Sequence, residues 1–136
     1  MRTLLIITLF IFNLNASSIN IEQKIYTLVL NGLFSNNDVI NIWCDTKSKN
    51  KLIKNINRVK IVENKNDADI LFVFNSYDIK TKKMIFVGKY RLLDQYPNNA
   101  VGGFYWQKGR PNLILIHDNV NKFNIKLIDE LKEYEE

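Results

Sequence analysis

One apolar segment, residues 69–75 (DILFVFN), constrains the fold more than any other part of the sequence. Its apolar residues are consecutive, so an extended strand formed by it has two apolar faces. Such a strand is stable only when both faces are covered, as at the centre of a parallel sheet between helices. We therefore expect residues 69–75 to form the central strand of an α/β sheet.

The segments around this strand alternate between helix and strand patterns. Helices are predicted where apolar residues recur at three- and four-residue steps, and strands where short apolar runs are bounded by polar turns. The predicted helices are residues 19–34, 47–58 and 125–134, with one or two helical turns in 89–95 and a turn or short helix in 118–124. The other predicted strands before the C-terminal half are residues 39–44, 59–62 and 84–87.

A β-hairpin follows in the C-terminal half of the chain. Residues 100–106 and 111–116 are its predicted strands, and Gly109 suits the left-handed residue of a three- to five-residue loop. Pro111 is compatible with the start of a strand. Because helix–strand alternation gives way to a hairpin, the sequence predicts a single small α/β domain. We expect a mixed β-sheet flanked by helices, with this hairpin and a closing helix.

The N-terminus has the pattern of a secretory signal peptide. Arg2 precedes an apolar run at residues 4–12, and a polar stretch then ends in Ala16. The run is shorter than the roughly 20 apolar residues that span a bilayer. We expect residues 1–16 to be a signal peptide and 17–136 to be the domain, soluble and periplasmic after cleavage. The alternative is that the run belongs to a buried first helix.

The composition disfavours nucleic-acid binding. The formal net charge of +5 comes mostly from lysines that are spread along the chain, and arginine is scarce. An exported protein also rarely meets nucleic acid. We therefore expect a protein partner rather than a nucleic acid.

The sequence contains no recognisable catalytic or metal-binding motif. Cys44 is the only cysteine and His117 the only histidine. Neither lies in a motif whose spacing is typical of metal ligands. We expect no metal, no cofactor and no enzymatic activity. Cys44 lies in an apolar run and is predicted to be a buried thiol, the alternative being a reactive or bridging one. For a hydrolase, the candidate residues are Asp67, Asp69 and His117.

Three consecutive aromatic residues in the hairpin are the candidate binding residues. Phe104 and Trp106 share one face of an extended strand, and Tyr105 lies on the other. At least one large ring must then lie away from the core, close to a basic hairpin tip. Aromatic residues and arginine are the usual anchors of protein interfaces. The predicted partner-binding residues are Phe104, Tyr105, Trp106, Lys108 and Arg110. The alternative is that helices cover both faces and these rings are only structural.

The order of these segments resembles the YfiR-like family of periplasmic regulators. The residues that carry the resemblance are 40–44 (INIWC), 68–73 (ADILFV), 102–106 (GGFYW) and 124–131 (NIKLIDEL). The resemblance implies a protein that binds and restrains a membrane signalling protein such as a diguanylate cyclase. Ala68 stands where the family often has cysteine, so the family's disulfide pattern cannot form in this chain.

Three functions follow from these observations. The first is a periplasmic regulatory domain that binds a periplasmic or membrane signalling protein, with self-association as a homodimer left open. The second is a small-solute binding protein related to transporter receptors, which predicts a deep cleft, normally between two lobes. The third is an enzyme, which predicts polar residues clustered in a pocket with shifted pKa values. The sequence favours the first.

Overall fold

Strand β3 (Ile70–Val73) is buried on both faces at the interior of the sheet. The computed structural model describes residues 18–76 and 78–136, and all four side chains of β3 are inaccessible to solvent. Ile70 and Phe72 face the core beneath helix α2 (Ser18–Leu33), whereas Leu71 and Val73 face the opposite core. The predicted central strand is therefore confirmed. The predicted signal peptide, residues 1–16, lies outside the described residues.

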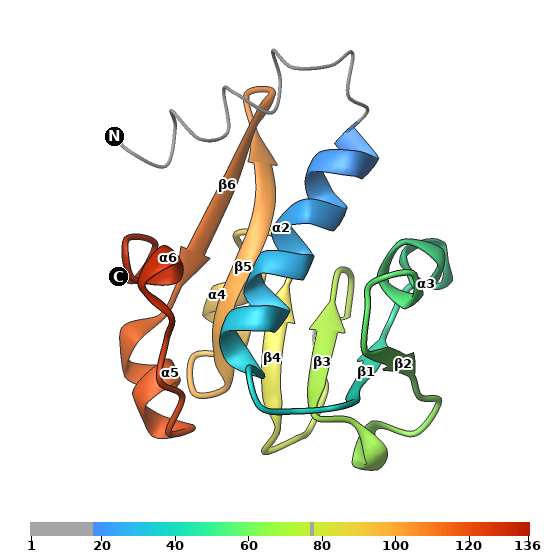
Figure 1. Cartoon of the computed structure of the whole chain (residues 1–136). Coiled ribbons are helices and arrows are strands. Elements are labelled where there is room, and N and C mark those ends of the chain that lie inside the picture. The colour runs from blue at the N-terminus through green and yellow to red at the C-terminus, as the bar shows by residue number, and fades with distance from the viewer. Residues whose placement is uncertain (1–17, 77) are drawn as a thin grey trace.

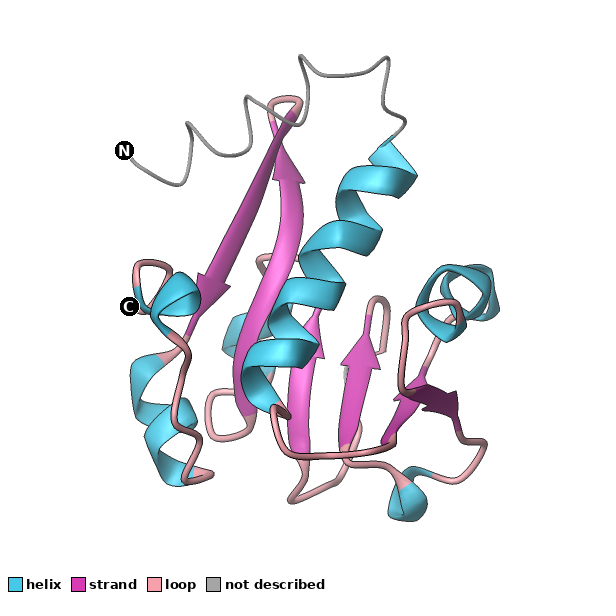
Figure 2. Ribbon diagram, in the orientation of Figure 1, coloured by secondary structure: helices cyan, strands magenta, loops and turns pink. Residues whose placement is uncertain are grey.

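The sheet has six strands in the order β2-β1-β3-β4-β5-β6. Their bounds are β1 Ile40–Cys44, β2 Val59–Ile61, β3 Ile70–Val73, β4 Met84–Val87, β5 Ala100–Gln107 and β6 Arg110–Leu115. The first five strands are parallel, and β6 pairs antiparallel with β5 (Figure 2). This is the predicted single α/β domain with a mixed sheet and a C-terminal hairpin.

Helices cover both faces of the sheet. The short elements are α3 Lys47–Lys54, the 3-10 helix η1 Lys65–Asp67, α4 Leu92–Gln95, α5 His117–Lys122 and α6 Asp129–Lys132. Helices α2 and α3 pack on one face, and α4 contributes Leu92 to the core on the other (Figure 1). α5 and α6 lie beside the β6 edge (Figure 1).

Helix α3 ends earlier than the predicted 47–58. Arg58 has a φ of 72°, which is incompatible with a continuing helix. Its guanidinium donates a hydrogen bond to the carbonyl of Phe34 at 2.8 Å and another to Asn31 Oδ1 at 2.8 Å. α3 already ends at Lys54, and the turn after it brings Arg58 to carbonyl and amide oxygens at the C-terminal end of α2.

Two further predictions are wrong in detail. The hairpin loop has two residues rather than three to five, because Gln107 already pairs with Arg110. The two loop residues, Lys108 and Gly109, have φ values of 52° and 75°. Positive φ at both central residues is the pattern of a type I′ turn, which matches the twist of the two strands. The closing helix spans only Asp129–Lys132 instead of 125–134. Residues 125–128 instead run without helix and bury Leu127 in the core.

The sheet changes its winding direction between β1 and β3. From β1 the chain passes through α3 to β2 on one side, and then returns to β3 on the other side. The carboxyl ends of β1 and β3 are therefore neighbours with connections that leave in opposite directions. In open α/β sheets, ligands bind in the crevice outside the strand ends at such a point.

Candidate functional site

An open pocket of about 420 Å³ lies at the carboxyl ends of the parallel strands, and we call it the edge pocket. Its volume is within the range of small-molecule sites. Helix α2, the start of α3, the segments after β3 and β4, and strand β5 all contribute to it. The lining residues are Glu22, Tyr26, Thr46, Ser48, Lys49, Phe74, Asn75, Gly88, Lys89, Phe104 and Trp106.

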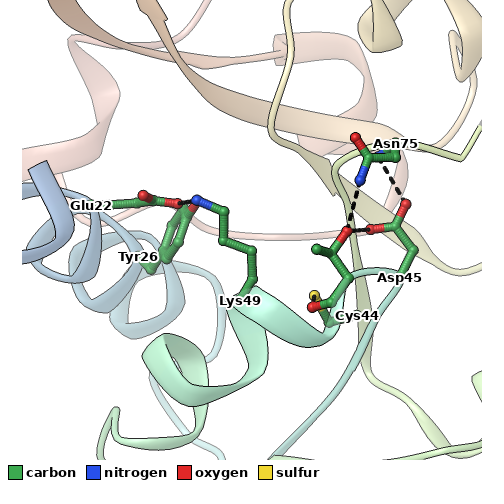
Figure 3. Close-up of polar contacts among 7 residues, drawn as sticks. Glu22, Tyr26, Cys44, Asp45, Lys49 and Asn75 are labelled. Atoms are coloured by element: carbon green, nitrogen blue, oxygen red, sulfur yellow. Dashed lines mark hydrogen bonds and ion pairs between the residues drawn. The ribbon is translucent and has the colours of Figure 1, made fainter.

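A buried polar cluster forms one wall of this pocket (Figure 3). Glu22 and Tyr26 lie one turn apart on α2, and the Tyr26 hydroxyl donates a hydrogen bond to the Glu22 carboxylate. Lys49 Nζ lies 2.7 Å from the same carboxylate oxygen. Glu22 is only 6% exposed, so these two donors replace the water that its carboxylate loses. Burial is the main cause that raises the pKa of Tyr26 well above its ordinary value, and the negative charge of Glu22 is the second. The phenol therefore keeps its proton and donates it in the hydrogen bond to Glu22.

The ring of Tyr26 fixes this cluster to the aromatic core. Tyr26 is 1% exposed and meets four phenylalanine rings edge-on. The centroid distances are 5.3 Å to Phe72, 6.3 Å to Phe74, 6.1 Å to Phe86 and 5.9 Å to Phe104. Edge-to-face pairs at these distances are favourable beyond their apolar burial. These four contacts fix the position of the Tyr26 ring at the floor of the edge pocket.

Asp45, directly after β1, holds the segment that follows β3. Its carboxylate accepts hydrogen bonds from the backbone N–H groups of Phe74 at 2.9 Å, Asn75 at 2.9 Å and Ser76 at 2.8 Å. Burial alone raises the pKa of Asp45, but these three hydrogen bonds outweigh it and the pKa lies below 3.8. The carboxylate thus joins the ends of β1 and β3 where the winding direction changes.

Side-chain hydrogen bonds extend this connection into the edge pocket. Asn75 donates to Thr46 Oγ1 at 3.0 Å, and Thr46 donates to Asp45 at 3.0 Å (Figure 3). Lys89, which follows β4, donates to Asn75 Oδ1 at 2.8 Å. The side chains at the rim of the pocket are therefore positioned before any ligand binds.

Cys44 is half-buried, so the prediction of a fully buried thiol is corrected. Its thiol lies 3.4 Å from the carbonyl oxygen of Thr46, to which it donates. Burial raises its pKa to about 11, so the thiol is protonated at neutral pH. A protonated thiol is a poor nucleophile.

The structure divides the five predicted partner-binding residues between core and surface. The ring of Phe104 is 2% exposed and belongs to the core, which corrects its expected place on the surface. Trp106 is 40% exposed and packs edge-on against Phe104, with 5.9 Å between the ring centroids. Tyr105 lies on the opposite face, and Lys108 and Arg110 are exposed at the hairpin tip.

A further exposed ring, which the sequence analysis missed, lies beside the hairpin. Tyr90 follows β4, is 59% exposed and packs edge-on against Tyr105 at a centroid distance of 5.3 Å. Tyr90, Tyr105 and Trp106 line a second open pocket of about 540 Å³ together with Gln107, Ile114 and Glu136. We use "hairpin surface" for Tyr90, Tyr105, Trp106, Lys108 and Arg110.

Of the residues considered for a hydrolase, His117 does not share a site with Asp69. Asp69 accepts a hydrogen bond from the backbone N–H of Asn41 at 2.8 Å, which joins it to β1. His117 follows β6 and pairs with Glu135 at 2.9 Å. β3 and β6 are three strand spacings apart in the sheet, or about 14 Å. Asp67 lies in η1.

Neither a metal site nor a membrane span is found in the part of the chain that the structure describes. Within residues 18–76 and 78–136, no three His, Cys, Asp or Glu side chains are grouped so that they could hold a metal ion. None of the helices described is long and apolar enough to cross a membrane.

Comparison with known proteins finds no matching family model, no similar curated protein and no similar solved structure. The resemblance to the YfiR-like family therefore stays a prediction.

Proposed function

We propose that the protein is an exported regulatory domain that binds an acidic surface of a periplasmic or membrane signalling protein through the hairpin surface. The observation that carries the proposal is that Tyr90, Tyr105 and Trp106 line one open pocket beside the exposed basic tip, although Tyr105 and Trp106 lie on opposite faces of β5. Tyr90 and Trp106 are 59% and 40% exposed, respectively. Large exposed rings grouped in this way are typical of interface centres.

The hairpin supports this role because it presents the rings on a paired β-ribbon. Its strands β5 and β6 extend beyond the ends of β3 and β4 (Figure 1). Two glycines let β5 pair closely with both of its neighbours, because a Cβ on Gly102 would collide with the Ile114 carbonyl of β6 and one on Gly103 with Val87 of β4. A ribbon fixed in this way loses little conformational freedom on binding, which favours affinity.

The charge of the hairpin tip supports an acidic partner. Among the described residues, Lys108 and Arg110 form no ion pair, and both side chains are exposed. Unpaired basic groups beside aromatic anchors favour an acidic partner, because complementary charge increases the rate of association and selects among partners. The YfiR-like resemblance implies the periplasmic part of a membrane diguanylate cyclase as that partner.

The test is affinity capture from the periplasm and membranes of the native host, with capture quantified against salt concentration. Lys108→Asn combined with Arg110→Gln removes the basic tip, and asparagine suits the positive φ of 52° at position 108. The matched control is Lys60→Gln combined with Lys126→Gln, which removes the same charge from exposed sites. We expect the tip variant to capture at least about tenfold less of an acidic partner. Equal capture by both variants contradicts the proposal.

The small-solute receptor is less well supported as the main function. Receptors of that class normally enclose the ligand between two lobes, whereas this chain forms one α/β domain. The edge pocket is nevertheless large enough for a small molecule.

A further inference from the structure

The polar lining of the edge pocket carries more positive than negative charge. It includes the ammonium groups of Lys49 and Lys89 and one carboxylate, that of Glu22. Lys49 is paired with Glu22 at 2.7 Å. Lys89 donates to the neutral amide oxygen of Asn75, so its charge is not balanced by a carboxylate in the pocket. The lining therefore suits a ligand with one negative charge.

The remaining wall of the pocket is aromatic. Phe74, Phe104 and Trp106 line it together with Tyr26. Trp106 is 40% exposed, so part of its ring is available to a ligand. Flat rings favour stacking or edge contacts with another flat ring. An apolar wall beside a small number of polar groups is the usual composition of a small-molecule site.

The pocket is also fixed by interactions that do not involve a ligand. Asp45 holds the backbone of residues 74–76, and Asn75 is held between Thr46 and Lys89. Glu22 and Tyr26 fix the opposite wall. A ligand therefore loses little affinity to ordering of the protein.

We propose that the edge pocket is a binding site for a small planar organic monoanion, such as an aromatic carboxylate. The carboxylate accepts hydrogen bonds from Lys89 and the neighbouring polar rim, and the ring packs against Trp106. The location agrees with the binding crevice of open α/β sheets, where the winding direction changes. Ligand binding in the edge pocket is a function additional to partner binding, and the pocket shares Trp106 with the hairpin surface.

The test is a titration of the purified ¹⁵N-labelled protein with benzoate, followed by amide and indole N–H chemical shifts. Benzamide has the ring without the charge, and acetate has the charge without the ring. We expect saturable shifts at Ser48, Asn75 and Lys89 and at the Trp106 indole. Both reference compounds should bind at least about fivefold more weakly, since each lacks one of the two interactions.

Two substitutions locate the site. Lys89→Gln should weaken benzoate binding at least about fivefold, whereas Lys60→Gln removes the same charge from β2 and should leave it unchanged. Trp106→Leu changes a partly exposed residue and should also weaken binding. Equal affinity in Lys89→Gln and Lys60→Gln, or acetate binding as tight as benzoate binding, overturns the proposal. Because the titration contains no protein partner, its outcome is independent of the function proposed for the hairpin surface.

Discussion

Glu22 shows how far a residue's sequence position can differ from its role. Near the start of an amphipathic helix, a glutamate is normally assigned to the positive end of the helix dipole. In the structure Glu22 is 6% exposed and is bonded to Tyr26 and Lys49. The helical spacing of Glu22 and Tyr26 is visible in the sequence. The approach of Lys49 from another helix is a tertiary contact, which periodicity cannot reveal.

Replacement of Glu22 by leucine should lower the free energy of unfolding by about 1–3 kcal/mol, because it leaves the Tyr26 hydroxyl buried without an acceptor. Glu22→Gln keeps an acceptor oxygen and should cost less. Urea denaturation of the two variants and the wild type measures both effects. A Glu22→Leu variant as stable as Glu22→Gln would show that the buried bonds contribute little.

The pKa of Cys44 gives a second prediction at this scale. Burial raises it from the ordinary 9.0 to about 11, so alkylation of the folded protein should depend on pH with a midpoint near 11. The same chain unfolded in urea should show a midpoint near 9.0. Iodoacetamide labelling rates at pH values from 7 to above 11, followed by mass spectrometry, test this. Rapid labelling of the folded protein at pH 7 is incompatible with it.

At the scale of elements, the Asp45 carboxylate joins the ends of β1 and β3. Asp45→Asn removes a charged acceptor of three backbone hydrogen bonds and should lower the free energy of unfolding by about 1–3 kcal/mol at neutral pH. The folded-state pKa lies below the ordinary 3.8. The contribution is therefore present above about pH 4 and is lost as the pH falls through the folded-state pKa.

Thermal melting of wild type and Asp45→Asn at pH 7 and near pH 3 tests whether this stabilising contribution is lost as the pH falls. The difference between the two melting temperatures should narrow at the lower pH. Asp38→Asn is the control, because Asp38 is an exposed carboxylate in the connection between α2 and β1. A difference between wild type and Asp45→Asn that is constant over this pH range would contradict the role given to Asp45.

The element boundaries show where sequence patterns suffice and where they fail. Strand β4 has the predicted bounds, Met84–Val87. A short apolar run between polar segments is typical of a buried strand. The two-residue turn was missed because lysine at position 108 is not a residue that signals positive φ. The closing helix was predicted too long because the apolar spacing at residues 125–128 also suits an irregular segment whose Leu127 enters the core.

At the scale of the whole molecule, the order of the segments was sufficient to predict the fold class. A strand with two apolar faces requires cover on both sides, and the alternating helices provide it. The hairpin was predicted from its apolar strand patterns and from Gly109 and Pro111, and the division of its aromatic residues between two faces from strand alternation. The edge pocket was not, because its lining comes from segments between Glu22 and Trp106 that meet only after folding.

Export is the prediction that concerns the whole chain. We expect cleavage after Ala16, so that the mature protein begins at Ser17. Intact-mass analysis of the protein from the periplasm of its native host measures this directly. Recovery of a soluble protein that retains residues 1–16 would contradict export by a cleaved signal peptide.

The central claim, that the hairpin surface binds the partner, is tested most directly by photocrosslinking in the native host. A photoreactive phenylalanine analogue is placed at Gln107, exposed on β5, or at Lys60, exposed on the edge strand β2. We predict a discrete crosslink to an acidic periplasmic or membrane signalling protein from position 107 and none from position 60. The crosslink should diminish when Lys108→Asn and Arg110→Gln are added. The same partner crosslinked only from position 60, or equally from both positions, would contradict the account.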